Sequence, residues 1–238
     1  MVSLFTREEG KIMAVARGVR KPRAKLAGAL QHFTLLDMHL APSRRFDVIT
    51  QARVLNPFYG LRTKLEAFSY ACYFAELFEA SLEERQRQPV LFDLLVDALA
   101  RLVDGEMPDM LARYVEINLV GMLGYLPHLT DCATCQTPLS HPERGWPTWL
   151  GFSASQGGAL CPDCLPRVPG AKRIAAGTAQ VAHLLLARGL EGLHGVQLSD
   201  RLRREVESTF RDYLEYRLEK RLNSGRFIHE WDGDNDSG

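Results

Sequence analysis

Four cysteines in two pairs are the residues of this chain whose spacing most clearly predicts chemistry. Cys132 and Cys135 bracket two residues, Cys161 and Cys164 bracket two more, and 25 residues separate the pairs. Each C-x-x-C turn presents two thiolates, and two such turns complete a tetrahedron around one metal ion. Because four sulfurs leave no open position at which water could be activated, the pattern predicts one structural zinc ion and no catalytic metal.

Paired cysteines also occur in disulfides, redox sites and iron–sulfur clusters. Disulfides need an oxidising compartment, which nothing in the sequence indicates. A thioredoxin-like redox pair needs one C-x-x-C at the start of a helix, whereas this segment is rich in Pro and Gly. An iron–sulfur cluster also takes four cysteines, and the spacing leaves that alternative open. The fifth cysteine, Cys72, lies in an apolar helical pattern and is predicted to be buried, and His128 and His141 are predicted to be surface residues.

The second chemical signal is an excess of positive charge near the N-terminus. Residues 1–64 contain 12 Lys and Arg against 4 Asp and Glu, although the whole chain has 29 of each and no net charge. A basic segment joined to an acidic one suggests a polyanionic partner, and the competing interpretation is a solvated basic face. The candidate nucleic-acid contacts lie in one predicted loop and its leading edge: Arg17, Arg20, Lys21, Arg23 and Lys25. Phe5, Phe33 and Phe46 are either stacking partners for bases or core residues, and the core assignment is favoured for each of them.

The elements that must position these residues change character along the chain. Alternating apolar residues predict strands over 2–6, 12–16, 33–40 and 46–54, typical of a small antiparallel barrel or sandwich. Helical periodicity then predicts helices over 61–78, 90–103 and 110–123, a short helix over 177–188, and a long helix capped by Ser199. The Pro- and Gly-rich cysteine segment lacks apolar residues for a core of its own, a deficit that a metal would supply.

These patterns predict an α+β multidomain chain with a small N-terminal β-barrel or sandwich, a helical domain and an inserted four-cysteine zinc module. The expected domains are 1–58 for the barrel, 59–128 with 170–230 for the helices, and 129–169 for the zinc module. The phosphate-binding, dinucleotide-binding, serine-hydrolase and H-E-x-x-H motifs do not occur, so a binding protein is predicted and an enzyme is not. No secretory signal or membrane span is recognised, which predicts a cytoplasmic protein.

Taken together, several stretches resemble the RecO family of bacterial DNA repair proteins. They are LFTREEGKIMAVARGVRKP, LQHFTLLDMHL with FDVITQARVL, LVGMLGYLPHLTDCATC, GGALCPDC and YLEYRLEKRLNSGRF, in the family's order over nearly the whole chain. The resemblance implies a recombination mediator that binds single- and double-stranded DNA, anneals strands, acts in the nucleoid, and helps to load RecA together with RecR and the single-stranded-DNA-binding protein. It implies that the N-terminal domain is an OB-like barrel (an oligonucleotide-binding fold), and it assigns the four cysteines to zinc and the five cations named above to that barrel.

One departure from the family pattern affects the barrel. Family members begin with a further strand upstream of the stretch that starts here at Val2, so the expected OB-like domain is incomplete, with an unpaired edge. The alternative to a DNA-binding mediator is a zinc-containing scaffold for protein interactions that does not contact DNA directly.

Overall fold

The structure is a computed structural model of the 238-residue chain, and it describes residues 1–16, 25–141, 143 and 145–224, with the side chains of Lys25 and Ala27 excepted. The chain divides into two compact units. Unit 1 contains Met1–Pro108 and the C-terminal residues from Leu222, and unit 2 contains Asp109–Arg221. The three-domain division expected from the sequence stays a prediction, because a division by contacts does not test which segments fold independently.

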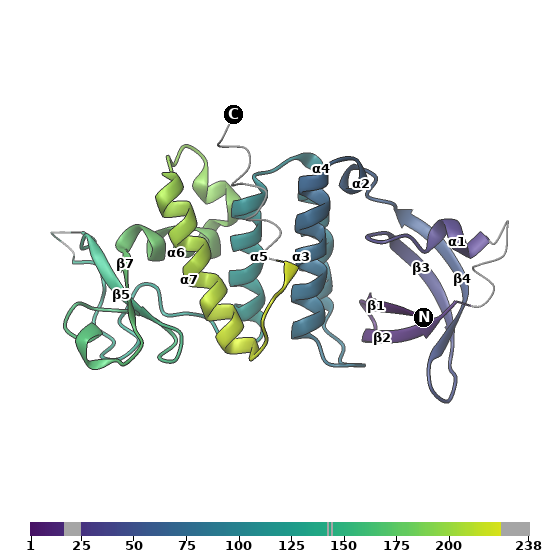
Figure 1. Cartoon of the computed structure of the whole chain (residues 1–238), viewed down its shortest axis with the longest axis horizontal. Helices are drawn as coiled ribbons and strands as arrows, with labels where there is room; N and C mark the ends of the chain where they lie inside the picture. Colours follow the sequence, from purple (N-terminus) through teal and green to yellow (C-terminus); the bar gives the residue numbers. More distant parts are fainter. Residues whose placement is uncertain (17–24, 142, 144, 225–238) are drawn as a thin grey trace. The chain divides into compact units, whose positions relative to one another are not determined.

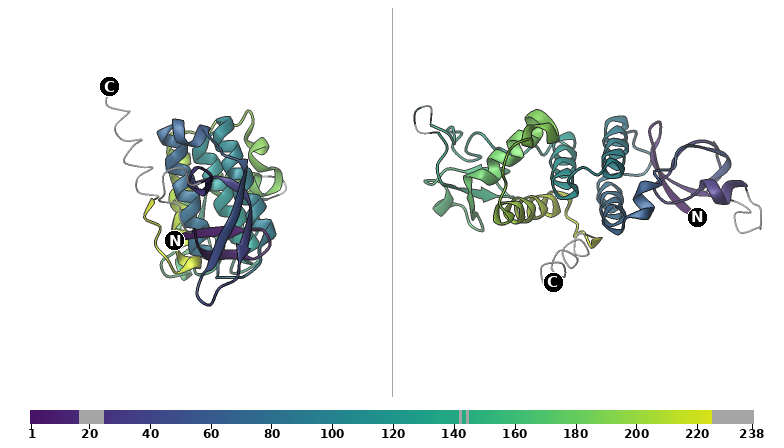
Figure 2. Two further views of the ribbon diagram at one scale, coloured as in Figure 1. Left: turned by 90° about the vertical axis from the view of Figure 1, so that its right-hand side faces the viewer. Right: turned by 90° about the horizontal axis from the view of Figure 1, so that it is seen from above.

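Unit 1 begins with a four-stranded sheet in the order β1-β2-β4-β3. Its strands are β1 (Val2–Thr6), β2 (Gly10–Val15), β3 (Leu35–Ala41) and β4 (Asp47–Asn56), and a short helix α1 (Lys25–Ala29) precedes β3. β1 pairs antiparallel with β2, and β3 with β4, while β2 and β4 meet in parallel over two residue pairs. The long, twisted β3–β4 hairpin is clearest in Figure 2. All four predicted strands are present, with ends shifted by one or two residues.

The predicted OB-like barrel is not confirmed, because no closed barrel is seen among the residues that the structure describes. Within the described residues the sheet is open, because β1 and β3 are its two edges and do not pair with each other. The structure therefore supports the coarser assignment of a sheet followed by helices. The helix α1 was not predicted; its first residue, Lys25, was assigned to the basic loop.

Gly10 sets how closely the sheet approaches the rest of unit 1. Its φ of +77° favours glycine, and a Cβ placed there would lie 1.9 Å from the backbone oxygen of Gln86. Beside it, Arg85 Nη2 donates to Asp47 Oδ2 over 2.7 Å and Arg85 Nη1 donates to Glu9 Oε2 over 3.0 Å. These contacts fix the start of β4 and the β1–β2 turn against the connection between two helices.

Three helices complete unit 1: α2 (Gly60–Thr63), α3 (Leu65–Ser81) and α4 (Pro89–Asp104). The broad apolar face predicted for α3 is confirmed, because it buries Ala67, Tyr70, Ala71, Tyr73, Phe74, Leu77 and Phe78. The predicted helix 61–78 is divided at Lys64, whose backbone is extended. Pro89 opens α4 and Gly105 closes it in the left-handed conformation, as residue preferences at helix ends lead one to expect. Figure 1 shows α3 and α4 beside the sheet of this unit.

Unit 2 combines helices with a second sheet. The helices are α5 (Pro108–Met122), α6 (Ala176–Arg188) and α7 (Asp200–Leu218), with short 3-10 turns η1 (Leu165–Arg167) and η2 (Gly189–Leu193). The sheet has β5 (Trp149–Ser153) at its centre, flanked by β6 (Gly158–Leu160) and β7 (Lys172–Ala175), all antiparallel. As predicted, Ser199 caps α7, accepting a hydrogen bond from Leu202 N on its side chain. The sheet itself was not predicted, apart from the hairpin return at Gly157–Gly158.

Aromatic packing holds this second sheet on α7. The ring centroid of Phe152 lies 5.8 Å from that of Phe210 and 5.7 Å from that of Tyr213, both in edge-on geometry. Tyr213 also donates its hydroxyl to the backbone oxygen of Tyr125 over 2.8 Å. In the part of the chain that the structure describes, no helix has the length and apolar character required to cross a membrane.

Candidate metal centre and basic surface

The first cysteine pair lies in a tight turn after α5. Cys132 N donates to Thr137 O and Gln136 N donates back to Cys132 O, each over 2.8 Å. Gln136 adopts a positive φ of 60°, which closes the turn. These two hydrogen bonds fix the shape of the turn that carries Cys132 and Cys135, which is the first of two cysteine turns, or knuckles.

The second pair follows β6 directly. Cys161 O accepts from the backbone nitrogens of Cys164 and Leu165, both at 3.1 Å, and the chain continues into η1. In addition, Cys161 N donates to Cys132 Sγ over 3.3 Å, so a thiol of the first knuckle already interacts with the backbone of the second.

Backbone pairing brings the two knuckles together across the intervening 25 residues. His128 N donates to Gly157 O, and Ala159 N donates to His128 O, at 2.9 and 2.8 Å. Gly158 permits this approach: its φ is +148°, and a Cβ there would lie 2.4 Å from His128 O. The Gly157–Gly158 pair is thus required where the chain passes close to the first knuckle.

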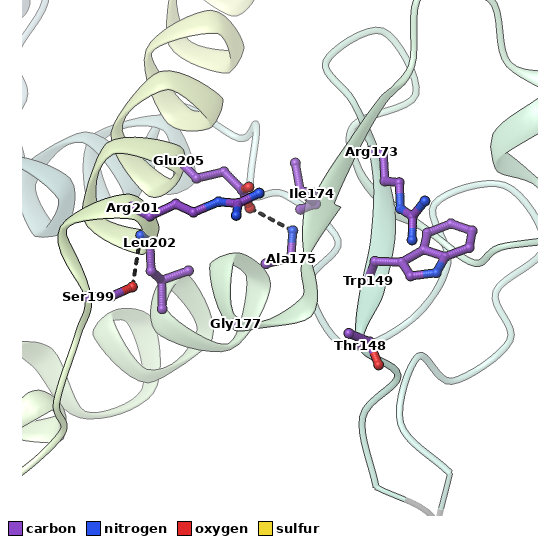
Figure 3. A pocket seen from close by; sticks show the side chains of 10 residues that line it. All are labelled: Thr148, Trp149, Arg173, Ile174, Ala175, Gly177, Ser199, Arg201, Leu202 and Glu205. Atoms are coloured by element: carbon purple, nitrogen blue, oxygen red, sulfur yellow. Dashed lines mark hydrogen bonds between the residues drawn. The ribbon is translucent and has the colours of Figure 1, made fainter.

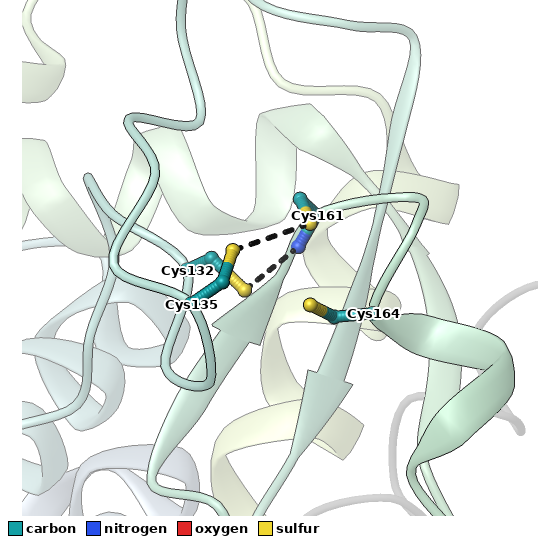
Figure 4. A group of neighbouring side chains, drawn as sticks. All are labelled: Cys132, Cys135, Cys161 and Cys164. Atoms are coloured by element: carbon teal, nitrogen blue, oxygen red, sulfur yellow. Dashed lines mark hydrogen bonds between the residues drawn. The ribbon is translucent and has the colours of Figure 1, made fainter.

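The four sulfurs form one compact group, drawn in Figure 4. Their Sγ atoms all lie within 4.8 Å of one another, and Cys135 Sγ is 3.8 Å from Cys161 Sγ. Four sulfurs at ~2.3 Å from a tetrahedral zinc ion are separated by ~3.8 Å. The arrangement therefore fits one tetrahedral ion. A cubane cluster, in which each cysteine binds a different iron atom, would hold the sulfurs farther apart.

The pKa values of three of the thiols differ. Hydrogen bonding with Thr137, whose Oγ1 lies 3.2 Å from Cys135 Sγ, lowers the pKa of Cys135 to about 6. In contrast, hydrogen bonding with Cys161 and burial raise the pKa of Cys164 to about 12, and burial raises that of Cys161. Without a metal ion, Cys135 thus forms a thiolate more readily than Cys161 and Cys164. A bound divalent ion reverses this, because it is coordinated by thiolates and displaces the protons.

The predicted exposure of the two nearby histidines is confirmed. His128 is half exposed and its Nδ1 lies 2.7 Å from Asp131 Oδ2, and His141 is exposed, so neither belongs to the sulfur group. Cys72 lies on α3, in the other unit, but it is only partly buried, so the prediction of a buried position is wrong. Four cysteines occupy all positions of a tetrahedral ion, and the site can support structure but offers no position for a substrate.

Most of the predicted DNA contacts cannot be located. Arg17, Arg20, Lys21 and Arg23 lie outside the described residues, and Lys25 begins α1 with a side chain that is also outside them. Two exposed cations that the sequence interpretation missed, Arg44 and Arg45, lie in the turn between β3 and β4. Their signal was present as adjacent arginines in a predicted turn.

The three phenylalanines considered as stacking partners differ in their packing. Phe5 is partly buried and packs against the rings of Phe78 and Phe92, with centroids 6.1 and 5.5 Å away. Phe33 packs edge-on against a ring of α3, and Phe46 lies under the guanidinium of Arg45, 5.4 Å from ring centroid to Cζ. Only Phe46 combines an aromatic face with an exposed cation.

Comparison with known proteins gives consistent matches over both units. Residues 1–58 match the family described as "Recombination protein O N terminal", and residues 62–226 match "Recombination protein O C terminal". Similar proteins include two called "DNA repair protein RecO", from Symbiobacterium thermophilum and Pelotomaculum thermopropionicum. Each is 36% identical to this chain over 96% of its length, covering 89% and 86% of the relative. A third of the same name, from a Roseiflexus species, is 35% identical over 93% of this chain and 76% of its own length.

Proposed function

The chain belongs to the RecO family of DNA repair proteins, and we propose that it is a recombination mediator that binds single- and double-stranded DNA and anneals complementary strands. In this role it assists the loading of RecA together with RecR, on DNA coated by the single-stranded-DNA-binding protein. It acts by binding rather than by catalysis. The observation that carries the proposal is the net charge of +8 on residues 1–64 in a chain of zero net charge.

The basic segment supplies the affinity in this proposal. Arg17, Arg20, Lys21, Arg23 and Lys25 neutralise phosphates and release counterions, so binding weakens as salt rises and depends little on base sequence. Arg44 and Arg45, exposed in the β3–β4 turn, are two further cations of the basic N-terminal segment. We assign the sheet of unit 1 to the family's OB-like DNA-binding domain on this basis.

Fluorescence anisotropy with a labelled single-stranded oligonucleotide across a salt series tests the proposal. Replacing Arg20, Lys21 and Arg23 by Gln removes three phosphate contacts, so the slope of log affinity against log salt should fall by about 2. A control triple variant carries the same charge change on exposed arginines elsewhere, Arg87, Arg188 and Arg221, all to Gln. Equal slopes for the two triple variants would remove the basic segment from the DNA site. No binding by the unaltered chain would favour the protein-interaction scaffold.

We further propose that the four cysteines hold one structural zinc ion. The support is the fit between the sulfur separations and a tetrahedral ion described above. Elemental analysis of the purified protein should find one zinc per chain, whereas several irons with a visible absorption band would identify a cluster instead. Changing Cys132 and Cys161 to Ser should abolish metal binding and lower the melting temperature. Cys72→Ser is the control, and it should retain the metal because Cys72 lies in unit 1.

A further inference from the structure

Unit 2 contains a pocket of about 630 Å³ that neither the metal centre nor the basic segment accounts for. It lies between the β5–β7 edge of the second sheet and the first turn of α7, as Figure 3 shows. Its lining comes from β5, β7, α6 and α7 and their junctions, and it includes Trp149, Arg173, Ile174, Arg201, Leu202 and Glu205. The volume is in the range of small-molecule sites, ~300–1,000 Å³.

Two arginines and one tryptophan give the pocket its chemistry. The guanidinium of Arg173 lies over the indole of Trp149, with Cζ 4.1 Å from the ring centroid. Arg201 lies on the opposite wall, in the first turn of α7. Among the described residues neither arginine forms an ion pair, whereas Arg203, two positions further along α7, pairs with Asp109 over 2.6 Å. Arg173 and Arg201 are therefore positioned for a negatively charged ligand.

The one carboxylate in the lining is already engaged. Glu205 Oε1 accepts from Ala175 N over 2.6 Å and from Thr178 Oγ1 over 2.5 Å. Its charge is thus directed at the beginning of α6, where helix geometry favours a negative group. The lining therefore carries two guanidinium groups against this one carboxylate, which leaves it positively charged overall, and Ile174 and Leu202 add apolar surface.

We propose that this pocket is a second single-stranded DNA contact, in which Trp149 stacks with a base and Arg173 and Arg201 hold the adjoining phosphates. The proposal rests on the proposed function and deepens it. Guanidinium groups bind phosphate oxygens in a planar, bidentate manner, and tryptophan and arginine planes stack with bases irrespective of sequence. Trp149 and Arg173 lie together on one wall of the pocket and Arg201 on the other, so one stacking plane and two cations are available to neighbouring bases and phosphates of a strand. Because the pocket lies wholly in unit 2, a chain with a further contact in unit 1 holds DNA at two places, as annealing of two strands requires.

Photo-cross-linking of the full chain to an oligonucleotide that carries 5-iodouracil tests the stacking contact directly. This base cross-links to aromatic side chains that it stacks on, and mass spectrometry of the digested product should identify the peptide containing Trp149. Arg173→Gln with Arg201→Gln should abolish this cross-link. The same double variant should lower the salt slope of binding by about 1.4, as expected for two lost phosphate contacts.

Arg188→Gln with Arg221→Gln is the matched control, since both arginines are exposed in unit 2 and lie outside the pocket lining. The two test arginines are exposed as well, so their loss should leave the melting temperature unchanged. Trp149→Leu should weaken binding between about 5-fold and 100-fold, the loss expected for one stacked base. Its folding is checked by the same melting curve.

The outcomes separate this proposal from the one on which it rests. If the unaltered chain does not bind the oligonucleotide, the mediator function fails. If it binds and the pocket variant behaves like its control, without loss of a Trp149 cross-link, only the pocket assignment is overturned. If the pocket variant binds DNA normally but no longer binds an aspartate-rich peptide, the occupant of the pocket is an acidic protein segment and not a DNA strand.

Discussion

Replacing Phe152 by Ala should release the metal ion, although Phe152 is not a ligand. Phe152 is 6% exposed and contacts two rings of α7, those of Phe210 and Tyr213. Removing such a buried ring costs about 3–5 kcal/mol, and the two edge-on pairs contribute ~0.5–1.5 kcal/mol each within that total. A loss of ~4 kcal/mol shifts the unfolding equilibrium roughly a thousandfold.

The second sheet couples this loss of stability to the metal site. Phe152 lies on β5, which pairs with β6 through Gly151 and Leu160, and Cys161 follows β6 at once. When β5 leaves α7, the second knuckle loses its support. Urea titrations monitored by circular dichroism and by a chromogenic zinc indicator should therefore show unfolding and metal release together, both at a lower midpoint than in the unaltered chain.

Phe5→Ala is the matched control for this experiment. Phe5 also makes two ring contacts, but in unit 1. Its loss should destabilise unit 1 and leave the midpoint of metal release unchanged. If Phe152→Ala kept its metal up to the same urea concentration as the control, the cysteine module would fold on its own, and the coupling through β5 and β6 would be wrong.

Three further changes test other contacts. Gly158→Ala should destabilise the cysteine turns by at least ~1–3 kcal/mol, because its φ is positive and a Cβ would meet the backbone of His128, and metal retention in a chelator titration measures the loss. Tyr213→Phe should lower the free energy of unfolding by ~1 kcal/mol through one lost hydrogen bond, as measured by urea titration. For Glu76, burial alone would raise the pKa, but hydrogen bonds from Ser224 and Asn223 outweigh it and the pKa is lowered. Its stabilising effect is therefore present above the unfolded pKa of ~4.3 and disappears as pH falls through the lower folded value. The melting temperatures of the unaltered chain and Glu76→Gln should differ at neutral pH and converge in acid.

The cysteine site was predictable because its information is local. Two C-x-x-C pairs identify the ligands without knowledge of the fold, and Gly157–Gly158 indicated the return of the chain. The strands of unit 1 and the helices were also found, since alternation and helical periodicity are strong over those lengths. Boundaries shifted where one residue changes conformation, as Lys64 does between α2 and α3.

The second sheet and its pocket were not predictable in the same way. β5 is preceded by Pro and Gly residues, β6 has three residues and β7 four, so no periodicity develops over such lengths. The pocket joins Trp149 and Arg173 to Arg201, more than 25 residues further along the chain, through pairing that only the fold creates. Adjacent arginines at Arg44 and Arg45 could have been noted from sequence, but their exposure depends on the hairpin.

The sulfur group and the pocket are connected by continuous backbone pairing, which would give the proposed structural ion a function. Cys161 follows β6, β6 pairs with β5, and β5 pairs with β7 through Trp149 opposite Ala175 and Gly151 opposite Arg173. An ion on the four cysteines would therefore support the sheet whose strands β5 and β7 carry Trp149 and Arg173. Removing the metal with a chelator should abolish the cross-link to Trp149, while the salt-dependent binding that is lost on replacing Arg20, Lys21 and Arg23 persists. An unchanged Trp149 cross-link in metal-free protein would show that the pocket forms without the ion. The role of the metal would then be limited to stabilising the cysteine turns.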